Sequence, residues 1–527
     1  MIYTRIVCLT SLLGCMVLPT SGPVLAQEGQ ERVPLIMSKL PPQSSPTYKA
    51  IKKRAGKATG QVLPLTKCEM WSVPKENVDA VTKAAATHGV GVKRLGADWN
   101  HVFHSAPSDM KMNDKQKSMM DQAKGSKATI GVGMMAAPLA PMVEFALTKG
   151  ADRPATSKEA AKIIVKLSEQ TTLTIARTSV DIKSDMCIWR GRVEGTDAPA
   201  TLMWWPGGKM AGTVQHEGRN YSIRHMGGEM HAVVEMSEDR MPQEHAPMPS
   251  RMRSNDPNLR DDPLIQQGDA SKLRPVTQGM RPPQAKGLQA KKKQKPATAV
   301  AKRGSAPKDV VIDVLVAYTK KAAGNYVDVR RELVDLSIEE GNESFRMSGL
   351  RHIKLRLVHA YQTDYVEDGE HFDHLYRMVD KGDGHMEDIH GLRDKYRADV
   401  VVLIVDDPAG CGLATRVFTD AEDAFAVVHH ECAASSYSLA HEIGHLIGAR
   451  HDPALDKNTT PFAYGRGYVN GTKWRDIMSY KASCGGCPRL PVWSSPKVMI
   501  KGEPAGTAEL DNARVISEQA ARVAAFR

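Results

Sequence analysis

One twelve-residue segment carries the residue types and the spacing that could do chemistry. It reads HEIGHLIGARHD, and Glu442 directly follows its first histidine. On a helix, His441 and His445 lie one turn apart on the same face, so both imidazoles could bind one Zn²⁺. Gly448 could end this helix in a left-handed turn and bring His451 to the same ion. Three neutral ligands leave one coordination position open for water, as a catalytic zinc site requires.

The competing interpretation is a helix with solvated histidines, because a bare His-Glu-x-x-His pattern often arises by chance. A glycine and a third histidine at fixed offsets reduce accidental matches by roughly two to three orders of magnitude. We therefore predict one Zn²⁺ per chain, with His441, His445 and His451 as ligands. Glu442 is placed to reach water at the metal and to act as the general base.

The same segment is the extended zinc signature of the metzincin metalloproteases, which the chain therefore resembles. Metzincins carry a Met-turn downstream, and residues 476–480 (DIMSY) look like it. The resemblance implies that Met478 forms an apolar floor below the histidines. It also implies that Tyr480 binds zinc or steadies the transition state. Asp452 is similar to the aspartate that anchors the fold below the site in the reprolysin-like branch.

Further segments narrow the resemblance to the bacterial peptidyl-Asp metalloendopeptidases, over residues 309–527. They read DVVVLIV (399–405), CGLA (411–414), YGRGYV (464–469) and CPRLPVWSSP (487–496). The resemblance implies a secreted zinc metalloendopeptidase that acts on protein or peptide substrates on the amino side of Asp. In this mechanism Glu442 takes a proton from the attacking water and delivers it to the leaving amine. Zinc and Tyr480 stabilise the developing oxyanion.

Cleavage before Asp would require a cationic pocket. Residues 451–500 contain seven Lys and Arg against three Asp and Glu, although the second half of the chain is acidic. Four cations are candidates for the pocket, although each is more often a solvated surface charge: Arg450, Arg466, Lys473 and Arg475.

These site residues must be positioned by a second folded region, residues 309–527. Buried strands are predicted at 310–317, 352–360, 400–405 and 425–428, and helices at 327–347, 386–397, from 438, and at 512–526. Strands that alternate with helices indicate an α/β or α+β unit, and we predict α+β. The resemblance implies a metzincin domain with a twisted mixed sheet, an active-site helix and a Met-turn.

The first half of the chain is predicted to contain four segments. These are a cleaved signal peptide (1–26), a mobile segment (27–60), a β-rich propeptide-like domain (61–236) with a β-meander in its later part, and a basic disordered linker (237–308). The signal peptide predicts secretion to the periplasm or the extracellular space. We expect no membrane association after its removal.

Composition and charge exclude some classes of function and suggest how the two halves interact. A chain with 41% hydrophobic and 25% charged residues is neither fully disordered nor fibrous. The net charge of +11 splits into +17 for residues 1–305 and −6 for residues 306–527. We therefore expect the halves to dock on each other as propeptide and enzyme in a monomer, with no nucleic-acid partner. Aspartates at 256, 261, 262, 269 and 309 could allow self-release.

Export favours disulfides among the six cysteines that follow the signal peptide. We favour Cys411–Cys432 and Cys484–Cys487, since nearby loops close at the least entropic cost, although four cysteines allow three pairings. Cys68 and Cys187 are predicted to pair, and a free thiol on zinc from one of them is the less favoured alternative.

Two other functions remain open from the sequence alone. One is a metzincin of broad specificity. The other is an exported binding or adhesion module in residues 68–236 that carries the protease domain with it.

Overall fold

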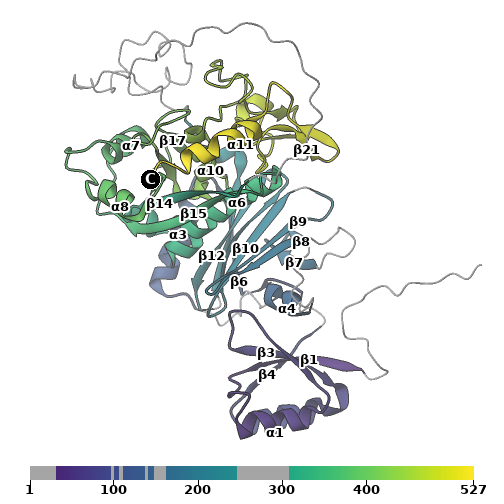
Figure 1. Ribbon diagram of the computed structural model, residues 1–527. Helices are drawn as coiled ribbons and strands as arrows, with labels where there is room; N and C mark the ends of the chain where they lie inside the picture. Colours follow the sequence, from purple (N-terminus) through teal and green to yellow (C-terminus); the bar gives the residue numbers. More distant parts are fainter. Residues whose placement is uncertain are drawn as a thin grey trace, which may run out of the picture. The chain divides into compact units, whose positions relative to one another are not determined.

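The computed structural model (Figure 1) describes residues 31–96, 100–105, 111–136, 140–147, 162–196, 198–228, 230–245 and 308–527. The predicted signal peptide, residues 246–307 of the predicted linker and the linker aspartates lie outside these ranges. The chain divides into two compact units, Met1–Trp99 with Met142–Ala151, and Asn100–Pro141 with Asp152–Arg527. Within the described ranges, no helix combines the length and the apolar character needed to cross a bilayer.

The smaller unit is built on an antiparallel sheet in the order β2-β3-β1-β4. Its strands are β1 (Arg32–Ser38), β2 (Thr59–Val62), β3 (Cys68–Pro74) and β4 (Gly91–Arg94). Its helices are α1 (Pro46–Ala55), η1 (Lys75–Asn77), α2 (Val78–Thr87) and most of α4 (Ala140–Leu147). The predicted β-rich domain at 61–236 is therefore divided between the two units.

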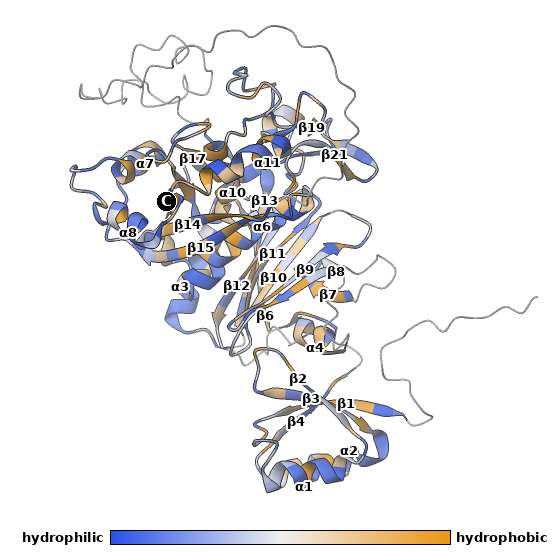
Figure 2. Ribbon diagram, in the orientation of Figure 1, coloured by the Kyte–Doolittle hydropathy of each residue, from blue (hydrophilic) through white to orange (hydrophobic). Residues whose placement is uncertain are grey.

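Residues 31–60 are ordered, so the prediction of a mobile segment over 27–60 is wrong there. Alternate residues of β1 are buried, and α1 packs Tyr48, Ile51 and Ala55 into the same core. Figure 2 shows that α1 is otherwise mainly hydrophilic. The apolar stripe of α1 is narrow, and the polar composition around it conceals its helical spacing.

The larger unit begins with a nine-stranded sheet in the order β5-β6-β13-β12-β11-β10-β9-β8-β7. Its elements are β5 (His104–Ser105), α3 (Asp114–Gly125), β6 (Thr129–Ala136), β7 (Lys162–Lys166), β8 (Thr172–Ile182), β9 (Cys187–Val193), β10 (Pro199–Trp205), β11 (Lys209–His216), β12 (Arg219–Gly227), β13 (Met230–Ser237) and η2 (Glu238–Arg240). Strands β8 to β13 pair antiparallel in chain order, which confirms the predicted β-meander.

The C-terminal domain (308–527) of the larger unit contains a mixed sheet in the order β15-β14-β16-β18-β17. Its strands are β14 (Val310–Tyr318), β15 (Ile353–Gln362), β16 (Val400–Val405), β17 (Gly412–Ala414) and β18 (Phe425–His429). All neighbours are parallel except β17, which lies antiparallel to β18 at the edge. This mixed α/β architecture agrees with the alternation of strands and helices in the sequence.

Helices cover both faces of this sheet. They are α5 (Lys320–Ala323), η5 (Arg330–Asp335), α6 (Leu336–Met347), α7 (His371–Val379), α8 (Asp388–Tyr396), α9 (His430–Ala433), α10 (Ser438–Ile447), η6 (Lys481–Cys484) and α11 (Asn512–Val523). Residues of α6, α10 and α11 form one core with β14 and β16, while α7 and α8 pack on the opposite face. Two hairpins follow α10 in sequence: β19 (Val469–Asn470) with β20 (Trp474–Arg475), and β21 (Ser495–Ile500) with β22 (Glu503–Ala505).

Buried ion pairs join the nine-stranded sheet to helix α6. Arg190 of β9 is buried, and its Nη2 lies 2.8 Å from Glu339 Oε2. Its Nε lies 3.7 Å from Glu343, and Lys183 reaches the other oxygen of Glu339 at 2.8 Å. The basic residues come from the first half of the chain and the acidic ones from the second. These pairs have the signs that the net charges of the two halves suggest, whereas the Arg475–Glu238 and Arg489–Glu244 pairs have the opposite signs.

Candidate active site and metal centre

Helix α10 positions the first two histidines of the predicted zinc signature. Tyr437 precedes the helix with a left-handed backbone (φ 62°), and Ser438 is its first residue. His441 and His445 project from one face, as their spacing predicts. Gly448 ends the helix with φ +133°, and a Cβ there would lie 2.9 Å from the Phe462 ring. Only glycine therefore fits this turn, which returns the chain toward His451.

The three imidazoles converge through their Nε2 atoms. His451 Nε2 lies 3.0 Å from His441 Nε2 and 2.9 Å from His445 Nε2. The Nδ1 atoms of His441 and His445 lie 2.8 and 2.9 Å from the carbonyls of Ile477 and Ala449. Because a carbonyl only accepts, each Nδ1 donates, and each neutral ring presents an unprotonated Nε2.

The donor set fits a metal ion. Burial lowers the pKa of His441 to about 3, and burial with neighbouring histidines lowers the pKa values of His445 and His451 well below the usual range. All three rings are therefore neutral near pH 7. Unprotonated nitrogens about 3 Å apart repel each other unless a proton or a cation lies between them. These three residues form one of two groups in the described chain that could hold a metal.

Glu442 lies fully buried beside the edge strand β17. A Cβ on Gly412 of this strand would lie 2.5 Å from Glu442 Oε1, so a glycine is required where the carboxylate passes. Neither carboxylate oxygen has a hydrogen-bond partner among the described residues. Burial raises the pKa of Glu442 well above its usual range, and the charge of Glu244 raises it further. This carboxylate is poised to exchange a proton.

The predicted Met-turn lies against α10 and the loop that carries His451. Met478 is buried, and its sulfur would lie 3.4 Å from a Cβ on Gly444 of α10. Asp452 Oδ2 accepts a hydrogen bond from the Tyr480 N–H at 3.0 Å. The Tyr480 and His451 rings are 4.3 Å apart between centroids. Asp452 thus ties the third histidine to the Met-turn.

Sequence reasoning missed the residue that supports the middle of α10. A Cβ on Gly444 would lie 2.4 Å from Trp493, so the indole packs directly on the helix backbone. Trp493 Nε1 donates to Ser344 Oγ at 3.0 Å, which joins α10 to α6. A glycine between the two histidines was the available signal, because an unexplained helical glycine often marks a close approach.

The four predicted specificity cations do not form one group, although Arg450 and Arg466 share a backbone bridge. Arg450 forms an ion pair with Asp456, and exposed Lys473 forms one with Glu503. Arg466 donates to the carbonyl of His451 at 3.2 Å. Arg475 is buried and pairs with Glu238. Another buried arginine beside α10, Arg489, was not among the candidates.

The structure contains both disulfides that the sequence favoured, Cys411–Cys432 and Cys484–Cys487. The pairing of Cys68 with Cys187 stays a prediction. Cys68 opens β3 of the smaller unit, whereas Cys187 opens β9 of the larger one. The even cysteine count in the first half carried no information on this division.

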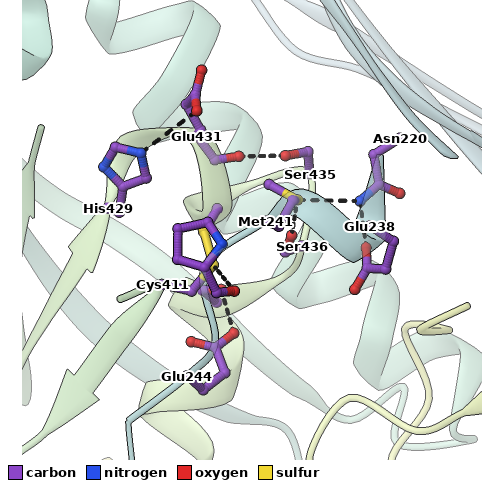
Figure 3. Close-up of a disulfide and its surroundings, with 12 residues drawn as sticks. Asn220, Glu238, Met241, Glu244, Cys411, His429, Glu431, Ser435 and Ser436 are labelled. Carbon is purple, nitrogen blue, oxygen red and sulfur yellow. Dashed lines mark hydrogen bonds and ion pairs between the residues drawn. A yellow bond between two sulfur atoms is a disulfide. The ribbon is translucent and has the colours of Figure 1, made fainter. Parts of the chain in front are cut away.

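The predicted linker starts later than residue 237. The connecting segment (238–245) is ordered against the C-terminal domain, and Figure 3 shows Met241 and Glu244 beside the Cys411 disulfide. The Cys411 N–H donates to the Gln243 carbonyl at 2.8 Å, and the His245 N–H donates to the Gly412 carbonyl at 3.0 Å. Strand β17 is thus paired along the edge that lies next to Glu442.

Comparison with known proteins agrees with this geometry. The profile of metallo-peptidase family M12 matches residues 308–494. The peptidyl-Asp metalloendopeptidase of Xanthomonas campestris pv. campestris is 34% identical over 382 residues, which cover 70% of this chain and 82% of that protein. The peptidyl-Asp metalloendopeptidase of Stenotrophomonas maltophilia is 35% identical over 340 residues, which cover 63% of this chain and 72% of that protein. The chain therefore belongs to the family of these bacterial peptidyl-Asp metalloendopeptidases, its residues 308–494 match metallo-peptidase family M12, and it is a metalloendopeptidase.

Proposed function

We propose that the chain is a secreted, zinc-dependent endopeptidase that cuts on the amino side of Asp and is made as a latent precursor. The observation that carries the peptidase chemistry is the convergence of three buried, neutral imidazoles next to the buried carboxylate of Glu442.

Zinc is supported by the chemistry of the donors. Three neutral imidazole nitrogens suit Zn²⁺ and leave one position for water or substrate. When bound, Zn²⁺ would supply Lewis-acid chemistry, by acidifying water and polarising the scissile carbonyl. His441 and His445 would be held in the ligating tautomer by their Nδ1 bonds to backbone carbonyls.

The chain's own residues would then move the proton and stabilise the negative charge. Glu442, whose pKa is raised by burial, would accept a proton at its carboxylate from the attacking water and pass it to the leaving amine. Tyr480 would donate its hydroxyl proton in a hydrogen bond to the developing oxyanion. Asp452 accepts a hydrogen bond from the Tyr480 backbone, which supports a fixed position of the Tyr480 side chain beside the scissile bond.

An extended substrate would bind along the edge strand β17. An edge strand offers unpaired N–H and C=O groups, to which a peptide can add as a further strand. The connecting segment makes hydrogen bonds to β17, which supports this mode of binding. Cleavage before Asp is supported by the relatives named above, whose names describe peptidyl-Asp enzymes.

Latency is supported by the same contacts. The connecting segment runs along the β17 edge that a substrate would need, and the alignment with the Xanthomonas protein is longer than residues 308–527, so it includes residues before this domain. We propose that residues 27 to about 308 act as an inhibitory propeptide, removed by cleavage within 237–309. The apolar run at 6–18 supports export by a signal peptide.

The test is to map cleavage sites on a peptide library with the purified full chain, after its size has become constant. Cuts should fall before Asp, disappear with a chelator and return with added Zn²⁺. Cleavage that persists in chelator would contradict the metal mechanism, and equal cleavage before all residues would contradict Asp specificity. The Glu442→Gln chain should remain full length, whereas wild type converts to a form the size of residues 309–527.

A further inference from the structure

A buried arginine and a serine hold a carboxylate of the connecting segment at the start of α10. Glu244 Oε1 accepts hydrogen bonds from Ser438 Oγ at 2.5 Å and from Arg489 Nη1 at 2.7 Å. All three residues are at most 5% exposed. Arg489 is fixed in place, because the same Nη1 also donates to the Ser436 carbonyl at 3.0 Å. This is a built site for one carboxylate, with a cation and a hydroxyl as donors.

The site lies next to the catalytic groups. Ser438 stands one helical turn before Glu442 on α10. The His245 N–H donates to the Gly412 carbonyl at 3.0 Å, and a Cβ on the same Gly412 would lie 2.5 Å from Glu442 Oε1. Glu244 is the residue before His245, so the segment that carries its carboxylate contacts the strand residue beside which Glu442 lies. A substrate side chain in the same place would lie beside the reacting groups.

The carboxylate in this site does not come from the C-terminal domain itself. Glu244 follows η2 and lies between the two residues whose backbones make hydrogen bonds to β17, Gln243 and His245. A second buried cation, Arg475, is paired with Glu238 of the same segment. When the segment leaves, Arg489 loses its carboxylate partner. A buried guanidinium without a counter-charge is unfavourable, so the emptied site favours another carboxylate.

We propose that Arg489 and Ser438 form the pocket that binds the side-chain carboxylate of the substrate Asp, and that Glu244 occupies this pocket in the precursor. The proposal rests on the proposed cleavage before Asp and names the residues that would select it. Glu244 then acts as a substrate-like group presented by the chain itself, on a segment that also occupies β17. One contact therefore provides both specificity and latency.

The specificity half is tested with two peptides that differ only in Asp or Asn at the selected position. In wild-type enzyme purified from the full chain, kcat/KM should strongly favour Asp. Arg489→Gln should lower kcat/KM for the Asp peptide by about 10²-fold while the Asn peptide changes little. Arg489→Lys should restore part of the preference. A merely structural role would lower both values equally, so an unchanged ratio would overturn the proposal.

A matched control and a milder variant keep this test informative. Arg393 is also buried and bonds to the carbonyls of Ala398 and Asp399, so Arg393→Gln should leave the Asp/Asn ratio unchanged. If Arg489→Gln fails to fold, Ser438→Ala removes one hydrogen bond and no charge, and it should lower the ratio by about tenfold. A wild type that does not prefer Asp would instead contradict the proposed function.

The occupancy half is tested in the uncleaved chain, with its size checked by intact mass. Glu244→Gln should raise the initial rate on the Asp peptide at least tenfold above that of the wild-type precursor. Exposed Asp239 of the same segment provides the control, and Asp239→Asn should not change that rate. If processed wild type cleaves the Asp peptide but the Glu244→Gln precursor is no more active than the wild-type precursor, Glu244 does not occupy the pocket.

Discussion

Two groups in the C-terminal domain have the residue types of a metal site, and they differ in how their nitrogens are satisfied. One group is His441, His445 and His451, and the other is Asp406, His429 and His430. In the first group, two rings bond to backbone carbonyls through Nδ1 and direct Nε2 to a common centre. A neutral carbonyl orients a ring without supplying a counter-charge.

In the second group, carboxylates already serve as partners of both histidines. His430 Nε2 lies 3.4 Å from Asp406 Oδ1, and His429 Nε2 lies 3.6 Å from Glu431 Oε2. The remaining nitrogen of His430 meets the Tyr326 hydroxyl at 3.0 Å. These contacts form a structural network at the ends of β16 and β18. The comparison teaches that ligand types in proximity do not define a metal site unless the donors remain available at one point.

The largest effect should follow from removing a ligand of the first group. His445→Ala should lose the bound metal and lower turnover by more than about 10⁴-fold, because the Lewis acid and the activated water are lost together. Metal content by mass spectrometry and peptide turnover measure both effects. His429→Gln in the second group should keep the metal. If His429→Gln also loses the metal, the two groups do not differ in the way proposed.

Removing the carboxylate beside the first group should separate chemistry from metal binding. Glu442→Gln should keep the metal and lower kcat by about 10²–10⁴-fold, the usual contribution of general acid–base catalysis. Glu431→Gln removes the buried carboxylate that pairs with His429 of the second group, and it should leave kcat unchanged. Turnover at the wild-type rate in Glu442→Gln would refute the assigned role.

A smaller effect is expected for Tyr480, whose ring packs edge-on against His451. Tyr480→Phe should lower kcat by about 10–100-fold, which is no more than the decrease in kcat usually seen when one oxyanion donor is removed. Metal content and KM should stay near wild type, because only the hydroxyl is removed. An unchanged kcat would show that Tyr480 acts only in packing.

The smallest effect concerns stability at acid pH and belongs to the second group. Burial opposes ionisation of Glu431, but the hydrogen bond with His429 and the charges of His430 and Arg224 lower its pKa to about 2. A lowered folded-state pKa stabilises the protein above the unfolded value near 4.5, and this stability is lost as pH falls toward 2.

Glu431→Gln should therefore flatten the fall in melting temperature between about pH 4.5 and pH 2. The measurement is best made in the Glu442→Gln background, where self-cleavage does not interfere. A fall as steep as in the parent chain would show that Glu431 does not contribute to acid sensitivity.

Much of the site could be predicted because its pattern is local. His441, Glu442 and His445 share one helical turn, and Gly448 must follow at the end of the helix. The favoured disulfides also close short loops, of 21 and 3 residues in sequence separation. The order of strands β8 to β13 was predictable for the same reason, since each turn joins neighbours in the sheet.

Other parts could not be predicted because they depend on distant partners. Helix α1 is stabilised by β1 and β3 of its own sheet, and its polar composition concealed the stripe that packs there. In the sequence, Arg489 is one of several cations in a basic stretch, and only its contact with Glu244 distinguishes it from the others. The hydrogen bond between Arg489 and Glu244 joins residues 245 positions apart in the sequence, and no helix or strand periodicity predicts a contact over that separation.

The sequence by itself predicted the three histidines, the carboxylate of Glu442 and the reaction class, because helical geometry converts residue spacing directly into position. The tertiary structure decided which of two histidine groups directs its Nε2 atoms to a common centre, which arginine lies beside the catalytic helix and which segment covers β17. These outcomes depend on burial and on pairing between residues far apart in the chain. Their energies come from desolvation and neighbouring charges that exist only in the folded protein.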